Sequence, residues 1–438
     1  MNTTVMDWPV WIAAGEWRSK HMTASSLQKT ITLRHAIALY VSSVLGSGVL
    51  VLPGLAAQIA GPSSLIAWII LSLASYPFAY TFGSLSARRP ESGGIYSFAK
   101  ESFGPHVSSV SAWLIALWYI TGAPAATLIA TSYISYAFPV SREGLYVFSA
   151  LIIFLAFIIN YRGIKFSSNV QVVVVLSIVI LLSCAVIFSM GKVQAGNFHP
   201  FFPHGIRPVG LVAALIFWSY LGYENVSNVA EEFRNPERDF HRSILGSVFL
   251  IGLLYIAMSF VTIGTLAYQT GGSVAPFAAI FSNVFGNYGA IATSLIAVFI
   301  IFGTINVYTA GMSRVIYAAA RDGSFPATLT HINKKNSVPD RSLVMLSGSS
   351  FIMLVVYYFL KVDLQTALLI PSGAAIIIYI LGSASGIRLL PGKKGKALAW
   401  ISLVFSAAIL PFVGKLAFAG IAAGLAGLIY SWLLRRRN

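Results

Sequence analysis

The sequence predicts an all-α integral membrane protein with twelve transmembrane helices. Of its 438 residues, 57% are hydrophobic and only 10% are charged, and the mean hydropathy is +0.79. A typical soluble domain carries about 25% charged residues. The apolar residues also fall into runs of about 20, the length at which a helix crosses the hydrocarbon core of a bilayer.

Twelve such runs follow an N-terminal segment, residues 1–33, which we expect to be cytoplasmic or to lie on the membrane surface. The predicted spans are residues 34–60, 63–85, 107–138, 145–160, 168–190, 208–232, 243–268, 288–319, 342–360, 364–387, 397–412 and 416–434. An even number of spans places both termini on the same side of the membrane.

The basic residues identify that side, because cytoplasmic loops are enriched in Lys and Arg. With twelve spans, 24 of the 29 Lys and Arg residues lie on the side of the termini. The five on the other side are Arg142, Lys192, Arg207, Lys361 and Lys415. We therefore expect a multi-pass protein of the cytoplasmic (inner) membrane with both termini in the cytoplasm. The net charge of +16 does not indicate nucleic acid as a partner, because it is spread over loops.

The first span contains Gly46-Ser47-Gly48 near its middle. A helix break at this depth exposes backbone N–H and C=O groups that lipid cannot satisfy. A second half-helix beginning near Ser47 would point free N–H groups and the positive end of its dipole inward, which suits a carboxylate. The alternative is that these small residues only permit close helix packing.

The sixth span is polar and interrupted along FWSYLGYENVSN, residues 217–228. The first span enters from the cytoplasm and the sixth, five spans later, from the opposite side. Two interrupted helices at matching places in oppositely oriented halves are typical of transporters built from inverted repeats. We expect residues 34–190 and 191–387 to form the two repeats. Residues 388–438 then supply two extra helices and a basic tail.

Five segments resemble the amino-acid/polyamine/organocation (APC) superfamily, and together they extend over nearly the whole chain from about Arg34. They are GSGVLVLPG, the loop ESGGIYSFAKESFG, NYRGIKFSSNVQ, FWSYLGYENVSNVAEEFRNPERDFHRSI and SRVIYAAARDGSFP. Within the superfamily, ITGAPAATL and EEFRNPERDF are most similar to bacterial exporters of methionine and branched-chain amino acids. The resemblance implies a LeuT-type five-plus-five repeat with broken helices 1 and 6.

The resemblance also implies a substrate site at the two breaks. Backbone N–H groups of Ser47 and Gly48, with the Ser47 hydroxyl, would bind the substrate carboxylate, and Gly46 belongs to the same substrate-binding segment. The carbonyls of Val44, Trp218 and Leu221 would bind the α-amino group. The Trp218 ring would lie over the substrate and close access from one side, although an interfacial tryptophan is the alternative.

Other residues are candidates for the walls of this site. Phe217, Tyr220 and Tyr379 are expected to line the access path or, alternatively, to pack in the core. Gly122 and Pro124 in the third span would leave an apolar space beside the substrate. Since no Lys or Arg lies near the middle of a span, the sequence favours a neutral apolar substrate such as methionine, leucine, isoleucine or valine.

Glu224 is the one carboxylate expected deep in the membrane, where a charge costs about 2.5–3.5 kcal/mol. We expect it to carry the coupling proton, with a hydrogen-bonded strut as the alternative. Sodium coupling through carbonyls and the hydroxyls of Ser43, Thr304 or Thr309 stays open. Proton-coupled import or exchange by the same fold also stays open beside proton antiport.

Other functional classes have less support. The seven His residues lie in loops or at span ends without a metal-binding or catalytic pattern, so neither an enzyme nor a metal site is predicted. Cys184 is the only cysteine, so no disulfide is possible within the chain. No filter sequence indicates a channel. The expected partners are an amino acid and membrane lipid, and no cofactor is expected beyond the coupling ion. The sequence does not predict an oligomeric state.

Overall fold

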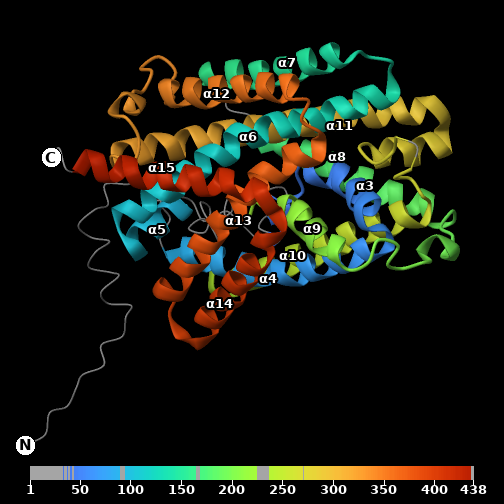
Figure 1. Cartoon of the computed structure of the whole chain (residues 1–438), viewed down its shortest axis with the longest axis horizontal. Coiled ribbons are helices and arrows are strands. Elements are labelled where there is room, and N and C mark those ends of the chain that lie inside the picture. The colour runs from blue at the N-terminus through green and yellow to red at the C-terminus, as the bar shows by residue number, and fades with distance from the viewer. Residues whose placement is uncertain are drawn as a thin grey trace, which may run out of the picture.

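A computed structural model describes residues 33, 37, 40–41, 44–88, 94–163, 168–223, 236–269 and 271–435. In this part of the chain the regular secondary structure is helical, apart from one isolated bridge between Asn333 and Val338. The α-helices (Figure 1) are α3 (Gly48–Ala60), α4 (Ser64–Arg88), α5 (Ile95–Phe103), α6 (Pro105–Ala137), α7 (Arg142–Tyr161), α8 (Ser168–Met190), α9 (Arg207–Ile216), α10 (Pro236–Gly264), α11 (Pro276–Arg321), α12 (Asp340–Phe359), α13 (Leu364–Leu389), α14 (Gly392–Ile409) and α15 (Ala417–Arg435). The 3₁₀ helices are η1 (Gly61–Ser63), η2 (Ala195–Phe198), η3 (Phe217–Tyr220), η5 (Ala327–Thr330) and η6 (Leu410–Leu416).

Nine helical stretches of the described chain are long and apolar enough to cross a membrane. Two of them, Gly48–Ser86 and Gly392–Leu433, each join two helices through a 3₁₀ turn, and Arg207–Tyr220 is a shorter apolar helix. Helix is therefore present within every predicted span, and the chain is a multi-pass membrane protein. The arrangement of twelve spans in two inverted repeats stays a prediction.

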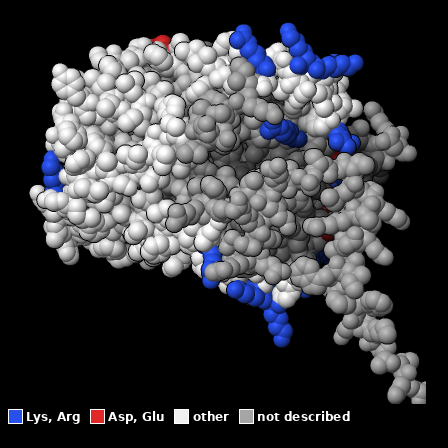
Figure 2. All heavy atoms as spheres, turned by 180° about the vertical axis from the view of Figure 1, so that it is seen from behind, with Lys and Arg blue, Asp and Glu red and all other residues white. Residues whose placement is uncertain are grey.

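The surface of the described chain is that of a protein surrounded by lipid. Large apolar side chains project outward from several helices, and Leu73, Val147 and Phe249 are each about 70% exposed. Figure 2 shows a broad face with few charged side chains, with Lys and Arg gathered toward one end and along the edges. Such an apolar surface is far larger than a soluble protein exposes.

Helix α6 is the central helix of the fold and packs against α5, α7, α11, α12, α13 and α15 (Figure 1). Its middle is rich in buried small residues, among them Gly122, Ala123, Ala125 and Ala126. Small side chains let helix backbones approach closely in a membrane, where packing drives helix association. The composition of this segment therefore explains why so many helices meet along α6.

Helix α11 bends sharply at Gly286, whose φ of 62° and ψ of −150° are not helical. Glycine adopts a positive φ without the steric cost that a side chain would add. The bend separates residues 276–285 from residues 287–321. The second part matches the predicted eighth span, and the first part is a helix that hydropathy did not predict.

The segment ESGGIYSFAKESFG was expected to be a loop, but its residues Ile95–Phe103 form α5. This helix buries Ile95, Tyr96, Phe98 and Ala99 on one side. Polar side chains of α5 contact Asp322, which directly follows α11. The Nζ atom of Lys100 lies 2.7 Å from Oδ2 of Asp322, and the Tyr96 hydroxyl donates to the same oxygen at 2.9 Å. Helix α5 thus joins the two halves of the chain.

Candidate functional site

The first span breaks at the Gly46-Ser47-Gly48 segment, as the sequence predicts. Helical structure at Val44 stops at residues 45–47, and α3 begins at Gly48. Across the break the Gly46 N–H donates to the Val44 carbonyl at 2.8 Å, a contact two residues back that no α-helix makes. Helix α3 therefore presents its first N–H groups at this point, where they lack partners within the helix.

The sixth span breaks as well. Helix α9 ends at Ile216, continues as the 3₁₀ helix η3, and becomes extended at Leu221, whose φ and ψ are −77° and 147°. The next residue, Gly222, has a φ of 124°. The description stops after Tyr223, so Glu224 lies outside the described residues. The interruption at residues 217–223 was predicted from the polar character of this segment.

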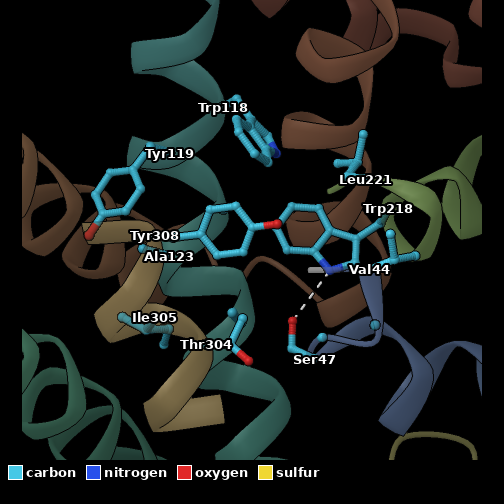
Figure 3. Close-up of a pocket in the computed structure, with 14 residues that line it drawn as sticks. Val44, Ser47, Trp118, Tyr119, Ala123, Trp218, Leu221, Thr304, Ile305 and Tyr308 are labelled. Atoms are coloured by element: carbon cyan, nitrogen blue, oxygen red, sulfur yellow. Dashed lines mark hydrogen bonds between the residues drawn. The ribbon is translucent and has the colours of Figure 1, made fainter. Parts of the chain in front are cut away.

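The two breaks face each other through Trp218 and Ser47. The indole Nε1 of Trp218 donates a long hydrogen bond of 3.4 Å to Oγ of Ser47 (Figure 3). At Gly48, a Cβ atom would lie 2.5 Å from Oγ of Ser219 and 2.7 Å from Cδ1 of Trp218. Real Cβ atoms do not approach neighbours that closely, so η3 can pack on the start of α3 only because residue 48 is glycine.

Tyr255 of α10 joins the carbonyls of the two breaks. Its hydroxyl lies 2.8 Å from the Ser219 carbonyl and 3.2 Å from the Val44 carbonyl. Tyr255 is fully buried, and its ring contacts Trp68 and Tyr220. Nothing in the sequence singles it out, because α10 is apolar around it. The Val44 carbonyl, expected to bind a substrate amine, is thus already an acceptor in this structure.

A pocket lies between the breaks and encloses about 570 Å³ of space free of protein atoms, part of it open to solvent. The described part of the chain contributes fourteen lining residues, all uncharged: Val44, Gly46, Ser47, Gly48, Trp118, Tyr119, Gly122, Ala123, Ala126, Trp218, Leu221, Thr304, Ile305 and Tyr308. All six residues expected to bind substrate are among them, together with Gly122.

The opposite walls come from α6 and α11. The sequence reasoning expected the small residues around Gly122 in one wall, but it missed Trp118, Tyr119, Ile305 and Tyr308. On α6, Trp118, Gly122 and Ala126 follow one another at four-residue spacing, which places them on one face. On α11, Thr304 and Tyr308 have the same spacing. This periodicity is visible in the sequence, but it does not reveal which face of each helix meets the breaks. Figure 3 shows Tyr308 and Trp218 extending toward each other across the pocket.

Gly122 is positioned by its contact with Trp218. A Cβ atom at residue 122 would lie 2.8 Å from Cη2 of Trp218 and 3.5 Å from Cβ of Pro371. The indole therefore lies between the start of α3 and the middle of α6. Pro124, which was expected to share the apolar space with Gly122, is buried in α6 and is not part of the lining.

Phe217, Tyr220 and Tyr379 also lie behind the pocket wall rather than in it, which agrees with the alternative that they pack in the core. All three are almost fully buried. Phe217 and Tyr379 pack edge to face with ring centroids 5.2 Å apart, and the Tyr220 hydroxyl lies 2.7 Å from Oγ of Ser72. Successive residues of the helix η3 point in different directions, so the side chains of residues 217 and 220 face away from that of residue 218. Neighbours of Trp218 in the sequence therefore need not line the pocket.

The hydroxyls proposed for sodium are engaged within the protein. Oγ1 of Thr304 donates to the Ile300 carbonyl at 2.9 Å, and Oγ1 of Thr309 donates to the Ile305 carbonyl at 2.7 Å. Tyr119 contacts Thr309 at 2.5 Å. Ser43 lies outside the described residues. Among the described residues there is no group of three or more His, Cys, Asp or Glu side chains placed to hold a metal ion.

A family model described as amino acid permease matches residues 31–433, which is most of the chain. The chain belongs to the amino acid permease family. This confirms the resemblance to the APC superfamily, and the family consists of transporters rather than enzymes. The substrate of this permease family is an amino acid.

Two individual relatives align with nearly the whole permease, and a third aligns with about three quarters of it. It is 32% identical to the uncharacterized amino acid permease YecA of Bacillus subtilis, with 92% of this chain and 96% of YecA covered. It is 30% identical to the L-methionine/branched-chain amino acid exporter YjeH of Escherichia coli, with 94% and 97% covered. The branched-chain amino acid permease BcaP of Bacillus subtilis is 27% identical, with 72% of each chain covered.

Proposed function

We propose that this permease is a secondary active transporter that exports neutral apolar L-amino acids, namely methionine, leucine, isoleucine and valine, by alternating access and proton antiport. The observation that carries the proposal is the pocket between the two broken helices, where the fourteen lining residues that the structure describes are all uncharged. A zwitterion fits such a site, because opposite ends of half-helices present N–H groups and carbonyls.

The walls argue for a neutral side chain. A charged substrate side chain would need an opposite charge in the pocket, since desolvating an unpaired ion is very unfavourable. The described lining residues are mostly apolar or aromatic. Their side-chain hydroxyls are those of Ser47 and Thr304 and the phenols of Tyr119 and Tyr308. This composition supports aliphatic and thioether side chains over basic or acidic ones.

The direction rests on the relatives. YjeH carries export in its name and covers 94% of this chain, which supports export. The name of BcaP states only a branched-chain amino acid permease, so a proton- or sodium-coupled importer or an exchanger is the second candidate. We further propose that both termini are cytoplasmic and that the membrane is the cytoplasmic membrane, because basic residues dominate the loops on that side.

The substrate is tested with purified protein in liposomes preloaded with unlabelled amino acid. We expect labelled methionine and leucine to accumulate by counterflow, and labelled arginine to stay at the level of empty liposomes. Counterflow requires no knowledge of the coupling ion. Robust counterflow of arginine would overturn the assignment of a neutral substrate.

Direction is tested in cells that overexpress the permease and grow on a toxic analogue of methionine or leucine. Export predicts protection and import predicts sensitisation. The Ser47→Pro variant is the control, because it removes a proposed carboxylate donor and should give neither effect. Sensitisation that depends on Ser47 would establish the importer instead.

A further inference from the structure

The indole N–H of Trp118 is a buried hydrogen-bond donor without a protein acceptor. Trp118 is 8% exposed, and its Nε1 atom has no hydrogen-bond partner among the described residues. Most buried polar groups in folded proteins are paired, because leaving a donor unpaired costs free energy. This donor therefore calls for an explanation, and its place in the molecule supplies one.

Trp118 lines the pocket from α6, one turn before Gly122. Figure 3 shows its ring above the pocket, with the nitrogen edge turned toward the side where Leu221 and Trp218 lie. The ring is held by Tyr308, whose ring meets it edge to face with centroids 5.6 Å apart and an interplanar angle of 88°. Ser47 and Gly48, which would hold the substrate carboxylate, lie on the α3 side of the pocket, whereas Trp118 belongs to the α6 wall, toward which a substrate side chain would extend.

The surroundings limit which acceptor suits this donor. Besides Trp118, the aromatic side chains of Tyr119, Trp218 and Tyr308 line the pocket, and the small residues Ala123 and Ala126 leave room beside them. Thioether sulfur makes favourable contacts with aromatic rings at about 5 Å and is also a weak hydrogen-bond acceptor. A strongly hydrated acceptor would lose hydrogen bonds to water, and this wall offers too few donors to replace them.

We propose that Trp118 is a specificity-determining residue that selects methionine over carbon-only side chains by donating its indole N–H to the thioether sulfur. This inference rests on the proposed transport of neutral amino acids and specifies a residue within it. In the present structure the nitrogen has no surface open to solvent. The proposed bond therefore requires the pocket to widen around a bound substrate until this nitrogen is exposed.

The test compares methionine with norleucine, which has the same chain length but a methylene group in place of sulfur. Each competes with labelled methionine in counterflow by purified protein in liposomes. We expect methionine to compete about fivefold better than norleucine, the size of one net hydrogen bond. In Trp118→Phe, which keeps an aromatic ring but lacks the N–H, the ratio should fall toward one, because only the contacts between sulfur and the aromatic rings are left to favour methionine.

The matched control is Trp113→Phe on the same helix. The Trp113 Nε1 donates to the Ser324 carbonyl at 3.0 Å, and Trp113 is not part of the pocket lining. This variant also removes one indole N–H, but it should keep the wild-type ratio. A change of ratio in Trp113→Phe equal to that in Trp118→Phe would overturn the proposal.

The outcomes separate this inference from the proposed function. Equal competition by methionine and norleucine in the wild-type protein would overturn the role of Trp118 and leave neutral amino-acid transport standing. Competition by neither methionine nor leucine would overturn the transport proposal itself. Equal competition in the wild-type protein would overturn the role of Trp118 even if Trp118→Phe fails to fold.

Discussion

The indole of Trp218 lies in a slot formed by two glycines, Gly48 at the start of α3 and Gly122 in α6. A Cβ atom at either position would come within 2.8 Å of the ring. The sequence reasoning selected Gly48 for its backbone N–H and Gly122 for the space it leaves. The structure adds that both glycines fix the position of one aromatic side chain, the residue proposed to gate the site.

Gly122→Ala should displace the Trp218 ring, because the added methyl group would lie 2.8 Å from its Cη2 atom. Overpacking of this kind costs about 1–3 kcal/mol. We expect a lower melting temperature and slower counterflow of methionine, with partial recovery of both in the double variant Gly122→Ala, Trp218→Phe. Gly311→Ala is the control, because a Cβ atom there meets nothing within 4 Å. Equal losses in both single variants would refute the slot.

Glu224→Gln should flatten the pH dependence of transport. We expect this because Glu224 is the one carboxylate predicted to lie deep in the membrane, and a group that carries the coupling proton must titrate. The measurement is the rate of methionine counterflow and of proton-driven transport between pH 5 and 8. A variant with the wild-type pH profile would show that Glu224 is only a hydrogen-bonded strut.

The residues of the site were predictable where the signal was local. Gly46, Ser47 and Gly48 weaken a helix in the middle of an apolar run, and a polar stretch interrupts the sixth span. Both helix breaks could therefore be predicted from the sequence. Trp118 and Tyr308 could not, because their place depends on how α6 and α11 rotate in the packed protein. For the same reason the sequence left open whether Phe217 and Tyr220 line the access path or pack in the core.

At the scale of the helix, the break in the first span is proposed to bind substrate through its N–H groups. Ser47→Pro removes the N–H and the hydroxyl of this residue, while the Ser47 φ of −60° already suits proline. Hydrogen bonds to a charged group contribute about 1.5–3 kcal/mol, so methionine should bind about 10-fold to 100-fold more weakly.

Ser47→Ala is the matched variant for the same position, because it loses the hydroxyl and keeps the N–H. Its affinity for methionine should lie between those of the wild type and of Ser47→Pro. Both variants should retain the helical circular dichroism of the wild type. Full methionine binding by Ser47→Pro would mean that the glycine and serine residues serve only helix packing.

The start of α13 depends on a capping carboxylate. Asp363 accepts hydrogen bonds from the Thr366 N–H at 3.0 Å and from the Thr366 hydroxyl at 2.6 Å. Partial burial alone would raise the pKa of Asp363, but the hydrogen bonds from Thr366 outweigh it and hold the pKa below its usual value. A lowered carboxyl pKa stabilises the folded state above the unfolded pKa, and this contribution is lost as pH falls through the folded pKa.

Asp363→Asn tests this contribution, because asparagine caps a helix about as well as aspartate but does not titrate. The melting temperature of the wild type should exceed that of the variant at neutral pH, and the difference should disappear as the pH falls below about 4. Asp363→Ala should cost about 0.5–2 kcal/mol at neutral pH. A constant difference between wild type and Asp363→Asn at all pH values would contradict the assignment.

For the whole molecule, hydropathy predicted the helices but not their full extent. It detects only the part of a helix that lies in lipid, so α14 begins at Gly392 rather than at residue 397, and residues 276–285 of α11 were missed. Helix α5 was missed for the same reason, since it is held by an ion pair and by burial of one face rather than by lipid. Contacts among helices are set by packing, which a hydropathy profile does not contain.

The orientation of the molecule is a prediction that follows from its basic residues, and three exposed lysines around α13 and α14 test it. Lys361 precedes α13, Lys394 lies at the start of α14, and Lys415 follows that helix. If α13 and α14 each cross the membrane, residues 361 and 415 share one side and residue 394 lies on the other. Because cytoplasmic loops are enriched in Lys and Arg, we expect residue 394 inside.

Single-cysteine variants measure this directly, because Cys184 is the only native cysteine and Cys184→Ser gives a background without thiols. In intact cells a membrane-impermeant maleimide should label Lys361→Cys and Lys415→Cys, whereas Lys394→Cys should react only after permeabilisation. The opposite pattern would invert the molecule in the membrane and place both termini outside. Equal labelling of all three would show that α13 and α14 do not span. Since α13 is the last helix of the predicted second repeat and α14 the first of the C-terminal pair, the twelve-span arrangement would then be wrong.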